Sequence, residues 1–66
     1  MQVTANGELI SLPEGAALPV LFEALGVRAK WVVAEVNGTA VDRSDMESTV
    51  LHNGDRVELV RAVAGG

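Results

Sequence analysis

The sequence predicts an α+β fold in which a mixed sheet of four to five strands carries one main helix on a single face. Three observations indicate this fold. Apolar residues alternate with period two in four segments, the turn dipeptide Asn-Gly occurs three times, and one segment has helical spacing. Because a single apolar helix stripe is available to cover the sheet, we expect the second sheet face to stay open.

The first two predicted strands form a hairpin over residues 1–12. The segments "MQVTA" and "ELISL" both place apolar side chains on one face, with Ile10 and Leu12 together after the turn. Asn6-Gly7 lies between them, and this dipeptide accepts the positive φ angles of a tight hairpin turn.

The segment with helical spacing spans residues 18–25. Pro19 is tolerated there only in the first turn, where its missing N–H would have no partner, and Gly26 suits a left-handed cap at the end. A helix this short is stable only when it packs on a sheet. Its apolar face has the spacing i, i+3, i+4, i+7 and consists of Leu18, Leu21, Phe22 and Leu25.

The chain after the helix predicts a third strand and then an irregular crossover. Alternate residues from Val32 to Val36 fall on the core face of the strand. In the crossover we expect Val41 to belong to a short edge strand. The run from Ser44 to Glu47 has the Ser-x-x-Glu form of a capping box and predicts one helical or 3₁₀ turn.

The last predicted strand covers residues 56–63 and leads directly into Ala64, Gly65 and Gly66. We therefore divide the chain into a folded domain, residues 1–62, and a flexible Gly-Gly arm, residues 63–66. On the open sheet face, Val33, Val60 and Ala62 are expected to form an exposed apolar patch, and such patches often mark partner sites. Arg61 is a further candidate, since it can pair with a carboxylate of a partner.

Composition excludes several classes of function. The chain has nine acidic and five basic residues and a net charge of −4, with no basic block to follow a nucleic-acid backbone. With no cysteine and one histidine, neither a disulfide framework nor a zinc site is expected. No apolar run approaches the roughly 20 residues that span a bilayer, and no leader pattern begins the chain, so we expect a cytoplasmic protein without a membrane partner.

No side chain predicts catalysis. His52 is the single histidine, and it lies beside a turn without a nucleophile or carboxylate arrangement. Trp31 is expected to cover the end of the helix and so to fix the start of the third strand. We therefore predict no catalytic residues, and we do not expect the protein to be an enzyme.

A resemblance joins these features. The chain is similar to the ThiS family, the small sulfur carriers of thiamine biosynthesis, which have a ubiquitin-like β-grasp fold and a C-terminal Gly-Gly. The resemblance covers the whole chain and rests on "MQV", "NGE", "EG", "LFEAL", "VAEVNG", "AVDR", "NGDRVELV" and "AVAGG" in this order. Asp42, where the family often has proline, and Met46, where an aromatic residue is frequent, depart from the pattern within the crossover.

The resemblance implies a chemistry for the end of the chain. An E1-like adenylyltransferase of the ThiF type uses ATP to adenylate the carboxylate of Gly66. Sulfur from a persulfide donor then displaces AMP and leaves a thiocarboxylate, which a thiazole synthase of the ThiG type consumes. The carrier itself binds no cofactor. Ala64, Gly65 and Gly66 thread the partner active site, where glycine, lacking Cβ, fits a narrow channel.

Three other interpretations share the predicted fold and arm. The nearest is the small subunit of molybdopterin synthase, which is usually longer. A second is a carrier for sulfur transfer to amino acids or tRNA. The third belongs to a different class, a ubiquitin-like modifier whose arm forms isopeptide bonds with other proteins.

Overall fold

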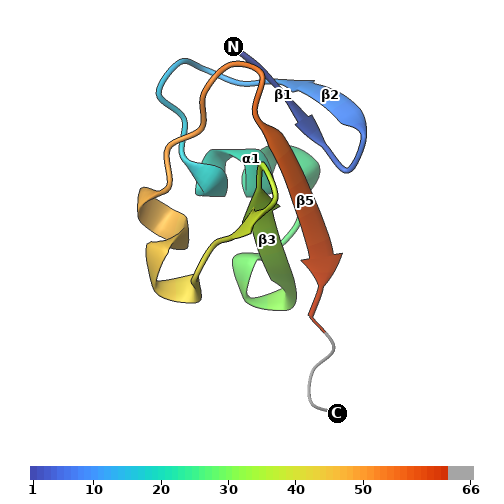
Figure 1. Ribbon diagram of the computed structural model, residues 1–66, viewed down its shortest axis with the longest axis vertical. Coiled ribbons are helices and arrows are strands. Elements are labelled where there is room, and N and C mark those ends of the chain that lie inside the picture. The colour runs from blue at the N-terminus through green and yellow to red at the C-terminus, as the bar shows by residue number, and fades with distance from the viewer. Residues whose placement is uncertain (63–66) are drawn as a thin grey trace.

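The first and last strands of the chain, β1 and β5, lie side by side and parallel within one mixed sheet, with strand order β2-β1-β5-β3-β4 (Figure 1). The structure, a computed structural model, describes residues 1–62, so the predicted arm, residues 63–66, lies outside the described residues. The elements are β1 (Gln2–Ala5), β2 (Glu8–Ser11), α1 (Leu18–Leu25), η1 (Ala29–Trp31), β3 (Val32–Val36), β4 (Thr39–Ala40), η2 (Arg43–Ser48) and β5 (Arg56–Arg61).

Two of the three Asn-Gly dipeptides form hairpin turns. Asn6 (φ 50°) and Gly7 (φ 83°) join the antiparallel strands β1 and β2, and Asn37 (φ 52°) plays the same part between β3 and β4. Positive φ at both central residues matches the right-handed twist of the flanking strands. The third dipeptide, ending in Gly54, lies in the loop that leads into β5 and closes no hairpin.

Strand β5 lies in the centre of the sheet because it pairs on both edges. It runs parallel to β1, with Ala5 opposite Val57, and antiparallel to β3 over five residue pairs. Val57 is fully buried, as expected for a strand that is covered by the helix and flanked on both sides. The predicted α+β fold with a mixed sheet and one main helix is confirmed.

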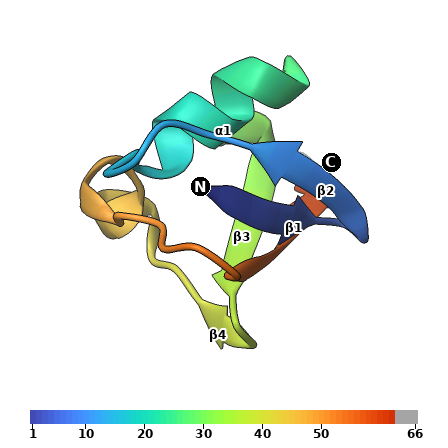
Figure 2. The ribbon, with the colours of Figure 1, turned by 90° about the horizontal axis from the view of Figure 1, so that it is seen from above.

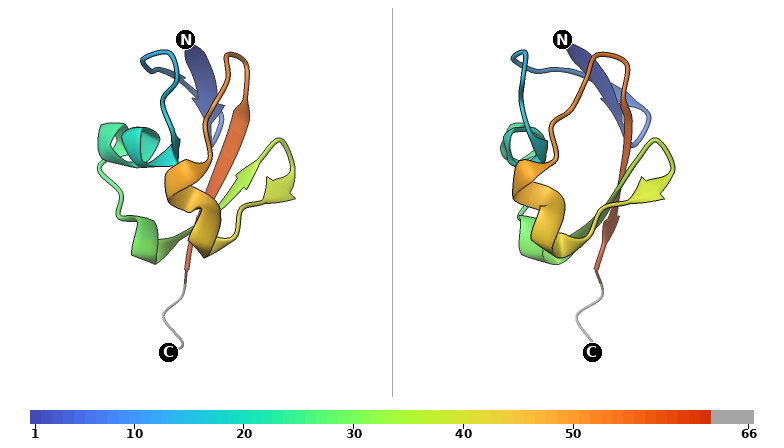
Figure 3. Two further views of the ribbon diagram at one scale, coloured as in Figure 1. Left: turned by 90° about the vertical axis from the view of Figure 1, so that its left-hand side faces the viewer. Right: turned by 60° about the vertical axis from the view of Figure 1, so that its left-hand side comes forward.

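Helix α1 packs on one sheet face, and η2 lies on the same side (Figures 2 and 3). Pro19 lies in the first turn, and Gly26 ends the helix with φ 71°, a left-handed conformation that glycine adopts without a Cβ clash. Between the helix and the sheet lies the apolar core. It consists of Val3, Ala5, Leu12, Ala16, Leu18, Leu21, Phe22, Val32, Ala34, Met46, Leu51 and Val57.

The crossover differs from the prediction at two points. The edge strand β4 exists, but it is Thr39–Ala40, and Val41 follows it with a backbone hydrogen bond to Ala34 O (2.9 Å). The predicted 3₁₀ turn also exists, but the capping box does not form. Since η2 begins at Arg43, the N-cap position belongs to Asp42, and Ser44 already lies inside the turn.

The last strand was predicted over residues 56–63, but it ends at Arg61, and Ala62 falls outside it. Strand β5 ends at Arg61, opposite Val32, because the preceding residue of the partner strand, Trp31, belongs to η1. Ala62 keeps one link to the sheet, donating its N–H to the carbonyl of Trp31 at 2.7 Å. Val63, the last residue of the predicted strand, lies outside the described residues.

We predict that Leu21→Ala lowers the free energy of unfolding by about 2–5 kcal/mol, because the fully buried side chain leaves a cavity between helix and sheet. Val20→Ala on the same helix is the matched control. Val20 is 41% exposed, and its loss should cost less than about 1 kcal/mol. Urea unfolding followed by circular dichroism measures both. Equal losses for the two variants would contradict the described core.

Candidate functional site

The uncovered sheet face carries two valines that lie directly opposite each other. Val33 of β3 pairs with Val60 of β5, and their side chains are 44% and 62% exposed. The core residues Val32, Ala34 and Val57 of the same strands face the helix, so strand alternation places the valines on the opposite face. Helix α1 and η2 both lie on the core side of the sheet (Figure 3). We call Val33 and Val60 the valine pair.

The predicted exposure is therefore confirmed for Val33 and Val60, whereas Ala62, the third residue of the predicted patch, is half-buried. The predicted partner contact at Val33, Val60, Arg61 and Ala62 stays a prediction.

Two glutamates follow the valine pair on the same face. Glu35 and Glu58 are also directly opposite, two residues along β3 and β5 from the valines. Like charges at such a position repel each other across the strands and weaken the pairing. Strand alternation placed these two on the outer face, but only the strand register brings them together.

Near the end of β5, beyond Val60, the surface is basic and hollowed. A hollow of about 670 Å³ lies between η1 and the end of β5, with Arg28, Trp31, Arg61 and Ala62 among its lining residues. We call it the basic hollow. Trp31 is 47% exposed there, and the ammonium of Lys30 lies 5.2 Å from the centroid of its indole ring, within cation–π range.

Arg43 connects η2 to the elements that line the hollow. Its guanidinium donates hydrogen bonds to the carbonyls of Ala29 (2.7 Å) and Val32 (3.0 Å), and so ties η2 to η1 and to the start of β3. The turn that carries Arg28 and Trp31 is thereby fixed against the sheet. Trp31 lines the hollow together with Gly26, the cap residue of α1, and the predicted covering of the helix end by Trp31 stays a prediction.

The predicted reactive end follows Ala62, one of the residues that line the hollow, in the sequence. Ala62, half-buried and hydrogen-bonded to Trp31, is the last described residue, and Ala64, Gly65 and Gly66 lie outside the described residues. Within residues 1–62 no group of His, Cys, Asp and Glu side chains could hold a metal ion. None of the helices described in that range is long and apolar enough to cross a membrane.

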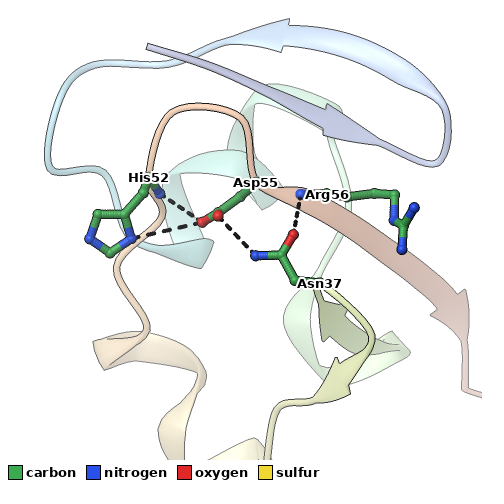
Figure 4. A network of polar contacts seen from close by, with 4 residues as sticks. All are labelled: Asn37, His52, Asp55 and Arg56. Atoms are coloured by element: carbon green, nitrogen blue, oxygen red, sulfur yellow. Dashed lines mark hydrogen bonds and ion pairs between the residues drawn. The ribbon is translucent and has the colours of Figure 1, made fainter.

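His52 belongs to a polar network at the opposite end of β5 (Figure 4). Its backbone N–H donates to Asp55 Oδ2 at 2.7 Å, while its ring Nδ1 lies 3.9 Å from the same oxygen. Asn37 connects the two loops, donating from Nδ2 to Asp55 Oδ1 (3.0 Å) and accepting the N–H of Arg56 (2.9 Å). The network joins the β3–β4 turn to the start of β5, so its role is structural.

The central last strand, the single helix on one face and the open second face define a ubiquitin-like β-grasp domain. The sequence pattern of the ThiS family matches residues 1–66, and the chain belongs to this family.

The chain is also similar to two solved structures and to one curated protein. The crystal structure of the thiamine biosynthesis protein (ThiS) from Geobacter metallireducens is 32% identical, with TM-score 0.83 and full coverage of both chains. The solution structure of a thiamine biosynthesis protein from the same organism has TM-score 0.76 at 32% identity, and covers 100% of this chain and 88% of that chain. The uncharacterized protein ycf40 of Porphyra purpurea is 27% identical over 66 residues, covering 100% of this chain and 93% of its own.

We predict that Asn37→Asp lowers the free energy of unfolding by about 1 kcal/mol or more, because the new carboxylate cannot donate to Asp55 and repels it. Aspartate still tolerates the left-handed backbone at this position. The control is His52→Gln, which keeps the backbone bond to Asp55 and should change stability by less than about 0.5 kcal/mol. Thermal unfolding of both variants measures the difference, and a larger loss at His52 would be the contrary result.

Proposed function

We propose that the protein is a sulfur carrier of thiamine biosynthesis and that the α-carboxylate of Gly66 carries the sulfur as a thiocarboxylate. The supporting observation is the match to the ThiS family over residues 1–66, a range that includes the Gly-Gly. The resemblance to a thiamine biosynthesis protein over the full length of both chains supports the same pathway.

The chemistry requires activation by another protein. A carboxylate is ionised at neutral pH and is a poor electrophile. An E1-like partner of the ThiF type supplies ATP, whose α-phosphorus the carboxylate oxygen attacks with release of pyrophosphate. Persulfide sulfur then attacks the acyl carbon, AMP leaves, and a thiol cleaves the sulfur–sulfur bond to free the thiocarboxylate. The carrier needs no cofactor of its own in this scheme and acts as a co-substrate rather than as an enzyme.

The arm delivers the acyl group into the partner enzymes. Four residues, 63–66, follow Ala62, and a fully extended chain of that length spans at most about 14 Å. We propose that Ala64, Gly65 and Gly66 thread first the adenylating site and then the site of a ThiG-type thiazole synthase. Glycine without Cβ lets the backbone pass a narrow channel, and docking of the domain raises the local concentration of the end.

The folded domain provides the docking surface in this proposal. The valine pair offers exposed apolar area on a sheet face that carries no helix. Arg61, opposite the buried Val32 and therefore on the helix side of β5, and Ala62 follow it in the chain before the arm. Apolar side chains that desolvate at the centre of an interface contribute most to affinity. We propose that the same face meets both partners in turn, in the cytoplasm.

Deleting Gly66 should abolish thiocarboxylate formation and leave the fold intact, because the acyl group would end one residue short of the reaction centre. The protein is incubated with the adenylating partner, ATP and a sulfur donor, and its intact mass is measured. Replacement of one oxygen by sulfur in the full chain is the expected result, with the truncated chain unchanged. Undiminished sulfur transfer by the truncated chain would sink the proposal, and adducts on lysines of other proteins would identify a modifier instead.

Val60→Asp should weaken binding to the adenylating partner about tenfold or more, because a charge at the centre of an apolar contact must be desolvated. Leu9→Asp is the matched control. Leu9 is 64% exposed on the edge strand β2, away from the arm, so the same change there should alter the dissociation constant less than about twofold. Calorimetric titration measures both, and equal effects would argue against docking through the valine pair.

A further inference from the structure

The charges of this chain are segregated in space. The protein has five basic residues and a net charge of −4, yet four of the five gather around η1. Arg28 precedes η1, Lys30 lies within it, Arg43 bonds to its first carbonyl, and Arg61 ends β5 beside it. The fifth, Arg56, begins β5 at the opposite end of the sheet. One end of an acidic protein is therefore basic.

Three of these cations are available for a partner. Arg43 is occupied by backbone carbonyls, but Arg28, Lys30 and Arg61 form no ion pair with a carboxylate of residues 1–62. All three are exposed, and the two arginines line the basic hollow. Guanidinium groups bind carboxylates through two parallel hydrogen bonds, and the exposed indole of Trp31 adds apolar area beside them.

The short length of the arm limits which part of a partner protein can lie against the basic hollow. Ala62 belongs to its lining, and the reactive end is at most about 14 Å further along the chain. If that end is to reach a site inside another protein, the rim around the entrance of that site must come against the basic hollow. The surface best suited to this position carries negative charge, because a basic rim would be repelled.

We propose that the basic hollow docks a carboxylate-bearing segment at the rim of the enzyme that accepts the arm. This inference rests on the proposed sulfur-carrier function and names the chemistry of the partner at the same site. Arg28 and Arg61 pair with Asp or Glu side chains of that segment, and Trp31 packs against its apolar part. The contact complements the valine pair, since it fixes the end of the domain from which the arm leaves.

Charge reversal tests the contact. Arg28→Glu and Arg61→Glu should each raise the dissociation constant for the ThiF-type enzyme about tenfold, with a smaller effect at high salt. Arg56→Glu is the matched control, since it makes the same charge change on β5 at its other end, and it should stay within about twofold of wild type. Circular dichroism verifies that each variant is folded. Dissociation constants of Arg28→Glu and Arg61→Glu within twofold of wild type would overturn the inference.

Carbodiimide coupling provides a second readout, because Lys30 is the single lysine of the chain. The reagent joins an amine to a carboxylate that lies in direct contact with it. We expect peptide mapping to find Lys30 joined to an Asp or Glu of the enzyme. The amine of Met1, at the far end of the domain, forms an ion pair with Glu14 of the same chain (3.3 Å), so it should couple within the chain and not to the enzyme. Lys30→Arg keeps the charge and removes the amine, so the coupled product should disappear while the complex still forms.

The outcomes separate this inference from the proposed function. Thiocarboxylate formation by the wild-type protein is followed by intact mass in the same preparations. Normal thiocarboxylate formation without Lys30 coupling and without an effect of charge reversal overturns the inference alone. Absence of thiocarboxylate from the wild type overturns both. Displacement of the complex by inorganic phosphate, with Lys30 uncoupled, would show that the hollow takes a phosphate group of the nucleotide and would also contradict the acidic segment.

Discussion

Strand β5 pairs along one edge with β1, in parallel, and along the other with β3, in antiparallel orientation. The other elements depend on these two pairings. The β1–β2 hairpin is joined to the rest of the sheet through β5, and the core residues Val3, Ala34 and Val57 lie on one face because the three strands share a register. A chain of this size buries only about 60% of the surface it exposes when unfolded, so it has little reserve to replace a lost central strand.

The same pairings order the surface along β5. After the exposed Arg56 at the start of the strand, the outer face presents the glutamate pair and then the valine pair, and the basic hollow lies at the end of β5 where the chain leaves the sheet. Acidic, apolar and basic regions thus succeed one another in the direction of the arm. A partner that places an acidic segment against the basic hollow and an apolar surface against the valine pair is favoured in that orientation. This order supports the proposed delivery of the Gly66 end into a site at the basic side.

Local sequence was sufficient for the parts of the fold that depend on local physics. The Asn-Gly turns at Asn6 and Asn37, the helix stripe and the cap at Gly26 follow from backbone preferences within a few residues. The errors lie in the crossover, where Val41 falls just outside β4 and the capping box at Ser44 does not form. There the ends of the elements depend on tertiary packing, such as the burial of Met46 in the core, rather than on the backbone preferences of the crossover residues themselves.

The surface of the site was predicted in part. Strand alternation places Val33 and Val60 on the open face, but their direct opposition needs the register of two strands that lie far apart in sequence. The basic hollow was missed, although Arg61 was a candidate. Arg28 and Trp31 come from the turn after the helix and Arg61 from the last strand, so no window of sequence contains them together. The sole signal was the concentration of positive charge in residues 28–30.

The position of β5 has a mechanical consequence for a protein that is held by its C-terminal end. Hydrogen bonds in the two ladders run across the strands, whereas a force applied through Ala62 acts along β5. Such a force loads both ladders in shear, so that many bonds must yield at once, instead of peeling them one after another from an edge. In the proposed function, an enzyme that grips the end of this chain would therefore load both ladders of β5 together.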